Sequence, residues 1–410
     1  MDLLKVDSID DAVRKLKKCC GAGFAATELA GLETAAGRVL AENIISAEDS
    51  PPYRRSAVDG YAVRSRDVGA AGDMIPTMLK ITGEIAAGQD PGDTTVDKGC
   101  CVYVSTGSAV PEGADAVVMV EYCESFGGNM LAVSKAASPG EHVVRAGEDM
   151  QKGDVILQKG RKLRAQDIGV LAALGITVIP VFRPWDITII STGDELVRPD
   201  ETPGPGQIRD INSYTINARS ISEGFNVLRI VVLRDERNHI IDALADASAG
   251  SDVVVISGGS SKGFKDMTAE LIGEVADSGV LTHGIAAKPG KPTITGFDSK
   301  SGTIYLGLPG HPAAALMVYE QILIRLWRDL TRQEDDLTVK ARITANIPSA
   351  PGRRTFQLIR FRDEEMTEAE PVIAKSGMIS PMSIADGYFE MSENREGVKA
   401  GDIVEIRLWR

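Results

Sequence analysis

Apolar residues recur with two different spacings along the chain, and the changes of spacing mark its parts. Residues 8–20 carry their apolar side chains on one helical face behind Ser8, which predicts an N-capped amphipathic helix. Between about residues 76 and 163, short apolar runs alternate with Gly, Pro and Asp, as is typical of strands joined by tight turns. A short helix is expected over residues 167–176.

Residues 186–330 follow a different pattern, in which apolar strand-like runs alternate with helix-like segments. Strands are predicted at 186–192, 226–233, 252–259, 280–287, 292–297 and 303–310, and helices at 212–225, 238–250, 265–276 and 312–330. This alternation indicates βαβ units around a mostly parallel sheet. From about residue 337 the chain returns to alternating strands, predicted at 337–347, 354–361, 370–376 and 402–409, which indicates a small antiparallel barrel or sandwich.

Composition limits the class of protein. A chain of 410 residues predicts two to four domains. The net charge of −13 argues against a general nucleic-acid binder, but it allows a small anion in a locally basic pocket. No apolar run approaches the length of a membrane span and the charged N-terminus lacks a signal-peptide core, so we expect a cytoplasmic protein without a membrane partner. The five cysteines lack Cys-x-x-Cys spacing, which favours buried reduced thiols over a zinc site.

Glycine-rich and charged loops follow the predicted strands of the α/β stretch. These loops contain Ser191, Thr192, Gly193, Asp194 and Glu195 after the first strand, Asp235 after the second, Gly258, Gly259, Ser260 and Asp266 after the third, and then Lys288, Lys291, Pro292, Pro309 and Gly310. Ligands of an open parallel sheet bind beyond the carboxyl ends of its strands, so we expect the loops to meet at one edge.

The residue types in these loops favour a phosphate ester handled with a divalent cation. Lysines and helix N-termini neutralise phosphate, while carboxylates hold a hard cation. A simple kinase or ATPase is disfavoured, because Gly263 is followed by Phe264 and not by the lysine of a P-loop.

Several of these motifs resemble those of one family. The segments are "STGDEL" (191–196), "SGGSSKGFKD" (257–266), "KPGKP" (288–292) and "GLPGHPAAA" (307–315), preceded by "SAVDGYAVR" (56–64), "GEIAAG" (83–88), "VSTGSAVPEGADAVV" (104–118) and "RAGEDM" (145–150). Together they resemble, in order and over essentially the whole chain, the signatures of the molybdopterin molybdenumtransferases. This is the MoeA family, which includes the gephyrin E domain.

The resemblance implies a multidomain fold of class α/β plus β. It implies a discontinuous, elongated N-terminal domain (1–53 and 142–180), a β-rich insertion domain (54–141), a doubly wound, mostly parallel α/β domain (181–330) and a C-terminal β-barrel (331–410). It further implies a homodimer whose site is shared between subunits, and transient contacts with other enzymes of molybdenum-cofactor synthesis.

The implied reaction is insertion of molybdate into the dithiolene of adenylylated molybdopterin, with Mg²⁺-dependent release of AMP. Matching the motifs assigns Asp59, Thr106 and Asp149 to the upstream functional set; Glu195, Asp235 and Asp266 to the cation and phosphates; and Lys288, Lys291 and Pro292 to molybdate. The alternatives are adenylylation of molybdopterin by ATP, a scaffold role, and insertion of tungstate. The insertion and barrel domains count against the first alternative, and the lack of an added partner domain counts against the second.

Within "GLPGHPAAA" the chain departs from the family pattern at two positions, and it reads "THGIAA" where some relatives carry a Lys just upstream of "KPGKP". His311 stands where relatives often carry Asn, and Ala314 stands where they carry Ser. The hydroxyl lost at Ala314 leaves open which group replaces it; the candidates are Ser376, Ser380, Arg353 and Arg354. His311 is interpreted as a hydrogen-bonded loop residue in preference to a base.

Overall fold

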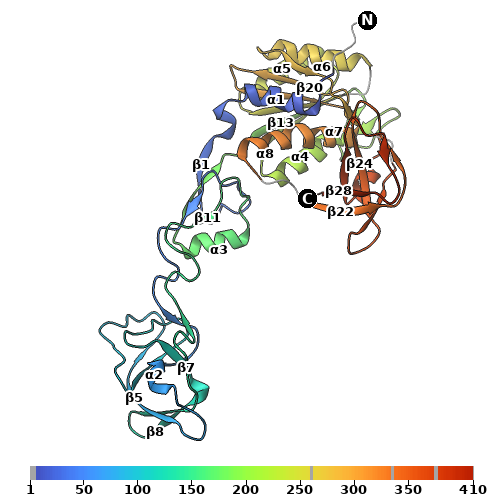
Figure 1. Cartoon of the computed structure of the whole chain (residues 1–410). Coiled ribbons are helices and arrows are strands. Elements are labelled where there is room, and N and C mark those ends of the chain that lie inside the picture. Colours follow the sequence, from blue (N-terminus) through green and yellow to red (C-terminus); the bar gives the residue numbers. More distant parts are fainter. Residues whose placement is uncertain (1–5, 259–261, 334–336, 374–376, 410) are drawn as a thin grey trace. The chain divides into compact units, whose positions relative to one another are not determined.

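The computed structural model describes residues 6–258, 262–333, 337–373 and 377–409. The chain forms two compact units, which Figure 1 colours along the sequence. Unit 1 comprises Met1–Glu42, Lys159–Arg164 and Val178–Arg410, and unit 2 comprises Asn43–Gln158 and Ala165–Thr177. The finer four-domain boundaries expected from the sequence remain a prediction.

A six-stranded sheet forms the centre of unit 1. Its order is β16 (Asn226–Leu233), β13 (Asp186–Thr192), β17 (Val253–Ser257), β21 (Thr303–Leu308), β20 (Ile294–Asp298) and β18 (Val280–His283). The first four strands are parallel, as predicted, whereas β20 runs antiparallel to both neighbours. The connections on either side of β20 are too short for the helical crossover that a parallel strand needs.

Helices cover both faces of this sheet (Figure 1). One face packs against α5 (Arg237–Ser248) and α6 (Lys262–Val275), and the other packs against α1 (Ile9–Cys19), α4 (Asn212–Glu223), α7 (Pro312–Tyr319) and α8 (Arg325–Thr331). Along β17, Val254 and Ile256 join the first cluster and Val253 and Val255 the second. Burial on both faces explains the unbroken apolar run of this strand.

The N-terminal segment docks on the sheet through α1 and an aromatic cluster. Ser8 accepts a hydrogen bond from the Asp11 backbone and begins α1, as the sequence predicts. Trp185 is stacked on Phe225, with ring centroids 5.5 Å apart, and its indole N–H donates to the Phe24 carbonyl at 2.9 Å. These contacts fix the start of the chain against the α/β core.

The last helix of the α/β region is interrupted, which corrects the prediction of one helix over 312–330. A π-helical turn, η3 (Glu320–Ile324), lies between α7 and α8, and all five of its residues are buried. Glu320 pairs with Arg219, while the adjacent Gln321 donates to the Tyr388 hydroxyl at 2.9 Å. The wider turn lets consecutive polar side chains reach different buried partners.

Five strands near the C-terminus close into a small barrel. They pair in the cycle β24 (Arg354–Phe361), β25 (Glu368–Pro371), β22 (Thr338–Ile343), β28 (Ile403–Leu408), β26 (Gly387–Met391) and back to β24. A barrel was predicted, but β22 and β25 pair in parallel and β26 was not foreseen. A short strand of the α/β region, β19 (Ala287–Lys288), also pairs with β24 in parallel.

Unit 2 is built around a second six-stranded sheet. Its order is β7 (Ala116–Met119), β4 (Gly60–Val63), β6 (Cys100–Val104), β5 (Thr77–Ile85), β9 (Met130–Val133) and β8 (Cys123–Phe126). Separate hydrophobic clusters lie on its two faces, around Leu79 and Val118 on one and Ile85 and Val117 on the other. The β-rich character expected of this region is therefore confirmed.

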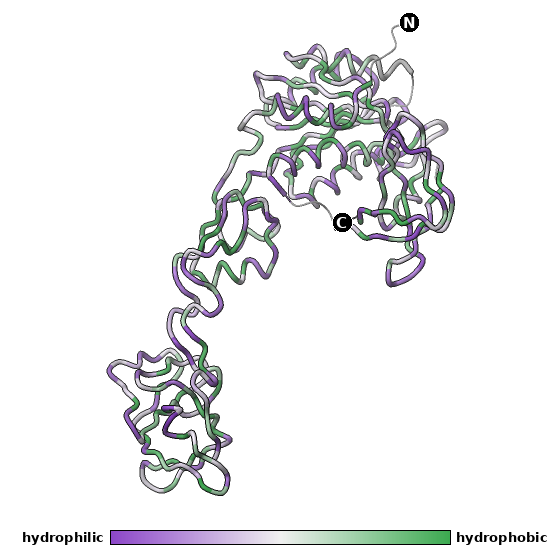
Figure 2. The backbone as a smooth tube through the Cα atoms, in the orientation of Figure 1, coloured by the Kyte–Doolittle hydropathy of each residue, from purple (hydrophilic) through white to green (hydrophobic). Residues whose placement is uncertain are grey.

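The remaining elements are short. They are η1 (Ala22–Ala25), β1 (Thr27–Gly31), β2 (Ile44–Ile45), β3 (Arg55–Ser56), α2 (Ser65–Val68), η2 (Val120–Tyr122), β10 (Val143–Val144), β11 (Val155–Leu157), α3 (Ala165–Ala173), β12 (Val178–Phe182), β14 (Leu196–Val197), β15 (Ile208–Arg209), β23 (Ile347–Pro348), α9 (Ser380–Ile384) and β27 (Gly397–Val398). Figure 2 shows hydrophobic and hydrophilic residues interleaved along the trace. Across the described residues, no helix has both the length and the apolar character of a membrane span.

All five cysteines are free thiols, and three of them have low acidity because of burial. Burial raises the pKa of Cys20, Cys101 and Cys123 to about 12. These thiols therefore stay protonated at neutral pH and behave as small apolar side chains.

Gly60 is expected to be essential for the sheet of unit 2. A Cβ atom at this position would lie 2.2 Å from the Val118 carbonyl oxygen in the neighbouring strand. Gly60→Ala should therefore destabilise the protein by about 1–3 kcal/mol, because backbone atoms must move apart. Gly83→Ala is the matched control, since a Cβ there meets nothing within 4 Å. Urea unfolding and limited proteolysis within residues 43–158 test this; equal stability of the two variants would contradict it.

Candidate functional site

The strand register places the glycine-rich and charged loops at one edge of the central sheet. Ser257, the last residue of β17, pairs with Ser191 on one side and Leu308 on the other. On the far side of β21, Ile294 begins β20 beside the end of β18. The loops that follow β13, β16, β17, β18 and β21 therefore all leave this edge, where ligands of such sheets bind.

Three carboxylates gather after the first two strands. The Gly193 N–H donates to the Leu233 carbonyl at 3.1 Å, which joins the ends of β13 and β16. The Asp235 N–H donates to Asp194 Oδ1 at 3.3 Å. Glu195 folds back over Gly193, because a Cβ on that glycine would lie 2.8 Å from Glu195 Oε2. Asp194, Glu195 and Asp235 thus form a carboxylate cluster.

Within the carboxylate cluster, burial and like charge shift the pKa of Asp235. Burial raises the pKa of Asp235, and the nearby Asp194 and Glu195 raise it further, while the Thr192 hydroxyl acts in the opposite direction. Its Oδ1 atom is buried and has no hydrogen-bond partner in the described part of the chain. A buried carboxylate oxygen surrounded by like charge favours the approach of a cation.

The carboxylate cluster fits Mg²⁺ only in part. Within the described residues, no group of three or more His, Cys, Asp or Glu side chains is arranged to hold a metal ion. Oxygen ligands from Asp235 and Glu195 nevertheless suit a cation that keeps several waters. Asp266, the third predicted ligand, lies in α6, but its side chain is outside the described residues, as are Gly259 and Ser260. Gly258 is buried at the end of β17.

The loop after β18 presents two lysines at the same edge. Lys288 and Lys291 are exposed, Pro292 is half-buried, and the loop turns at Gly290 with φ of 116°. A Cβ on Gly290 would lie 2.6 Å from Val318 of α7, so only glycine allows this close approach. Pairing of Lys288 with Thr355 joins the loop to the barrel.

The loop after β21 begins α7 and contains both departures of "GLPGHPAAA" from the family pattern. Pro309 is buried and the Gly310 carbonyl accepts a hydrogen bond from Asn212 at 3.0 Å. His311 is the N-cap residue of α7 and is exposed, and Ala314 is buried. Gly377 of the barrel region lies beside the His311 ring.

The candidates to replace the hydroxyl lost at Ala314 have different surroundings. Arg354 is held by Asp10, Glu390 and Glu393. Arg353 and Ser380, the latter at the start of α9, are exposed, and Ser376 lies outside the described residues. These ion pairs make Arg354 a poor candidate for an oxyanion contact.

The sequence reasoning missed a polar segment at the start of α4. Asp210 Oδ1 accepts hydrogen bonds from the Ser191 hydroxyl at 3.1 Å and the Ser213 N–H at 3.2 Å. Asn212 donates to the Ser257 hydroxyl at 2.7 Å, as well as to Gly310. The segment therefore links the ends of β13, β17 and β21. Asp-x-Asn-Ser before a helical pattern is a helix-start signal that would have pointed to it.

The upstream candidates lie in unit 2. The Thr106 N–H and hydroxyl both donate to Asp59 Oδ1, at 2.7 and 2.9 Å. These hydrogen bonds, the backbone one first, lower the pKa of Asp59, so its exposed carboxylate is ionised at neutral pH. Asp149 is also exposed, and its N–H donates to the Ser50 carbonyl at 3.1 Å. Asp59 and Thr106 thus form one preorganised pair.

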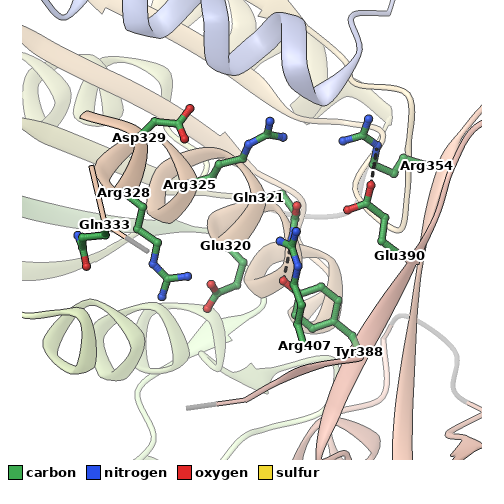
Figure 3. A pocket seen from close by; sticks show the side chains of 10 residues that line it. All are labelled: Glu320, Gln321, Arg325, Arg328, Asp329, Gln333, Arg354, Tyr388, Glu390 and Arg407. Atoms are coloured by element: carbon green, nitrogen blue, oxygen red, sulfur yellow. Dashed lines mark hydrogen bonds and ion pairs between the residues drawn. The ribbon is translucent and has the colours of Figure 1, made fainter. Parts of the chain in front are cut away.

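A cavity of about 370 Å³ lies elsewhere in unit 1, between η3, α8 and the barrel (Figure 3). It is lined by Glu320, Gln321, Arg325, Arg328, Asp329, Gln333, Arg354, Tyr388, Glu390 and Arg407. In Figure 3, Arg354 points toward Glu390 and Gln321 toward Tyr388. Asp10 of α1 pairs with both Arg325 and Arg354. Because these groups pair across the junction, we interpret them as joining the helices to the barrel.

Asp235 generates a pH-dependent prediction. Its folded-state pKa is raised, so the folded protein holds this proton more tightly than the unfolded chain, and stability is lost as pH rises through the folded pKa. Asp235→Asn should therefore raise the unfolding temperature at pH 7, and the gain should shrink as the pH falls through that pKa. Asp200→Asn is an exposed control. Calorimetry over this pH range tests the sign; a loss of stability at pH 7 would contradict it.

Comparison with known proteins agrees with these arrangements over nearly the whole chain. Profiles described as "MoeA N-terminal region (domain I and II)", "Probable molybdopterin binding domain" and "MoeA C-terminal region (domain IV)" match residues 7–175, 188–329 and 340–409. The molybdopterin molybdenumtransferase of Haemophilus influenzae is 32% identical over 93% of this chain and 93% of its own length. That of Bacillus subtilis is 29% identical over 98% of this chain and 94% of its own length.

Solved structures give the same result. The molybdopterin biosynthesis MoeA protein of Pyrococcus horikoshii OT3 superposes with a TM-score of 0.82 at 30% identity, covering 99% of this chain and all of that one. The resemblance found in the motifs is thereby confirmed. Matching profiles, relatives and structures all span the chain from its first helix to its barrel, and the chain belongs to the MoeA family of molybdenum-cofactor biosynthesis.

Proposed function

We propose that this transferase inserts molybdate into the dithiolene of adenylylated molybdopterin and releases AMP in a Mg²⁺-dependent reaction. Family membership supports a transferase of molybdenum-cofactor biosynthesis. The observation that carries the finer proposal is the convergence of five strand-end loops on one edge, with a carboxylate cluster at one position and two exposed lysines at another.

The residues at this edge suit the two halves of such a substrate. Gly258 lets the backbone approach phosphate closely at the end of β17. Asp235 and Glu195, with Asp266 from α6, would hold Mg²⁺ beside the phosphates. The bound cation would neutralise the charge that develops on the phosphate oxygens when AMP leaves. The chain itself contributes mainly positioning and fixed charge.

Lys288 and Lys291, with Pro292 between the loop and β20, suit the incoming oxyanion. Molybdate is a dianion, and each exposed ammonium group supplies three donors to such an ion. The Gly290 turn sets both lysines on one short loop, and its contact with Val318 limits how far the loop moves. The same argument applies to tungstate, which has nearly the same size and charge, so metal preference must be measured.

A direct assay distinguishes the proposal from adenylylation of molybdopterin. Purified protein with adenylylated molybdopterin, molybdate and Mg²⁺ should release one AMP for each molybdenum-bearing pterin formed. Molybdopterin with ATP should give no adenylylated product. Product metal analysis after competition between molybdate and tungstate gives the preference. Turnover in the ATP reaction alone would contradict the proposal and support the adenylyltransferase alternative.

We further propose that the protein acts as a homodimer whose subunits share each site. The Asp59–Thr106 pair belongs to one compact unit and the strand-end loops to the other, so two separately folded parts carry functional residues. In a shared site, Asp59 of one subunit serves a ligand held by the other. Transient contacts with the enzymes that supply the substrate and take the product belong to the same proposal.

Subunit complementation tests the shared site. Asp59→Asn and Asp266→Asn proteins should each be inactive, and mixing them with subunit exchange should restore activity. A random mixture contains about half mixed dimers, each with one intact site, so recovery near a quarter of wild type is expected. Mixing two Asp59→Asn preparations is the control. Exchange demonstrated by mass measurement without recovered activity would contradict sharing.

A further inference from the structure

Asp210 is a buried carboxylate, and one of its two oxygens receives no hydrogen bond from the described residues. The residue is 3% exposed. Its Oδ1 atom accepts hydrogen bonds from the Ser191 hydroxyl and from the Ser213 N–H in the first turn of α4. Its Oδ2 atom is also buried and has no hydrogen-bond partner among the described residues.

Asn212, two residues later, is also buried and also has a side-chain oxygen that the described residues leave without a donor. Asn212 is 8% exposed, and its amide nitrogen donates hydrogen bonds to the Ser257 hydroxyl and to the Gly310 carbonyl. A carbonyl can only accept, so these contacts fix the orientation of the amide. The Asn212 Oδ1 atom is then a second buried acceptor, which none of the described residues satisfies.

Two unmatched acceptors at one helix start are a substantial cost. Each buried acceptor without a donor costs about 1–3 kcal/mol, and more when it is charged. Asn212 bridges the ends of β17 and β21, so both atoms belong to the edge where the loops converge. Buried polar groups in native proteins are almost always hydrogen-bonded, so both atoms are expected to meet a donor from outside the described side chains.

The missing partner must be a donor. Phosphate and molybdate are excluded at these atoms, because an anion would face a carboxylate and an amide oxygen. Mg²⁺ is less suited to these two atoms, because one of them belongs to a neutral amide, whereas the carboxylate cluster offers three carboxylates. In the proposed substrate, the aminopyrimidinone ring of the pterin presents a ring N–H and an amino group side by side, both of which only donate.

We propose that Asp210 and Asn212 recognise the pterin through this N–H edge, an inference that rests on the proposed function. Asp210 would accept a hydrogen bond at Oδ2, and Asn212 would accept one at Oδ1. They are positioning and specificity residues, not reacting groups. The pterin would lie near the ends of β13, β17 and β21, with the phosphates toward Gly258. A ring with a carbonyl in place of the amino group would keep the ring N–H but set an oxygen against the other acceptor, and would bind less well.

Asp210→Asn tests the inference with little change in shape. The remaining carbonyl oxygen can still accept from Ser191 and Ser213, and Asn caps helices as well as Asp does. The new amide nitrogen replaces the Oδ2 acceptor with a donor. Affinity for adenylylated molybdopterin should fall about ten- to a hundredfold, as expected for loss of one charge-assisted hydrogen bond. AMP affinity should stay within about twofold, and the unfolding temperature should hold or rise.

Asp298→Asn is the matched control. Asp298 is also buried, at the opposite end of β20, but both of its oxygens accept hydrogen bonds. This variant should lose stability and keep its affinity for adenylylated molybdopterin. Together, the two variants separate loss of ligand recognition from loss of a structural hydrogen bond.

Calorimetric titration with adenylylated molybdopterin and with AMP decides between the outcomes. Unchanged affinity of Asp210→Asn for adenylylated molybdopterin would overturn the inference and leave the proposed function standing. An equal loss for AMP would reassign the acceptors to the nucleotide, and a marked drop in unfolding temperature would make them structural; both would overturn it. Failure of the wild type to bind adenylylated molybdopterin would instead overturn the proposed function, on which the inference rests.

Discussion

Parallel pairing of β13, β17 and β21, with both faces buried, is the constraint on which the rest of unit 1 depends. Register between these strands brings Ser191, Ser257 and Leu308 to one level, so the polar loops have to begin there. The helices on both faces supply the apolar burial that holds the strands in register. Nothing in a single loop specifies the site; the sheet beneath the loops brings it together.

The edge concentrates polar groups that are poorly satisfied within the chain, while the core below it is apolar. Asp235 sits beside two other carboxylates, and Asp210 and Asn212 each leave an acceptor without a donor. Such arrangements lower stability, and they persist because the packed sheet holds them in place. The same rigidity keeps the groups oriented before a ligand arrives, which reduces the ordering that binding requires.

Much of this fold follows from local sequence patterns. The Ser8 cap indicates a helix start, and the unbroken apolar run of β17 indicates a strand buried on both faces. The helix α1 and the sheet centre were therefore predictable. The antiparallel turn of β20 and the π-helical turn at Glu320 were not, because short connections and buried partners such as Tyr388 decide them. β26 escaped prediction since its flanking residues resemble a loop.

The residues of the candidate site were likewise predictable only in part from the sequence. Spacing after the strands indicated where the carboxylates and lysines gather, and the family motifs assigned roles to them. Asp210 and Asn212 were overlooked because a helix cap and a binding group have the same sequence pattern. Only the hydrogen bonds reveal that one oxygen of each is left over. An unsatisfied atom is a property of three-dimensional arrangement, and a sequence does not display it.

The pairing of β19 with β24 has a consequence for how the protein is made. During synthesis, all strands of the central sheet emerge before the barrel does, and domains generally fold as they appear. Lys288 lies on β19, whose ladder partner Thr355 is translated 67 residues later. The lysine loop therefore reaches its final form only when the barrel closes. A nascent chain would hold a complete sheet with an unfinished lysine loop, and this loop would be the last part of the sheet edge to take its final form.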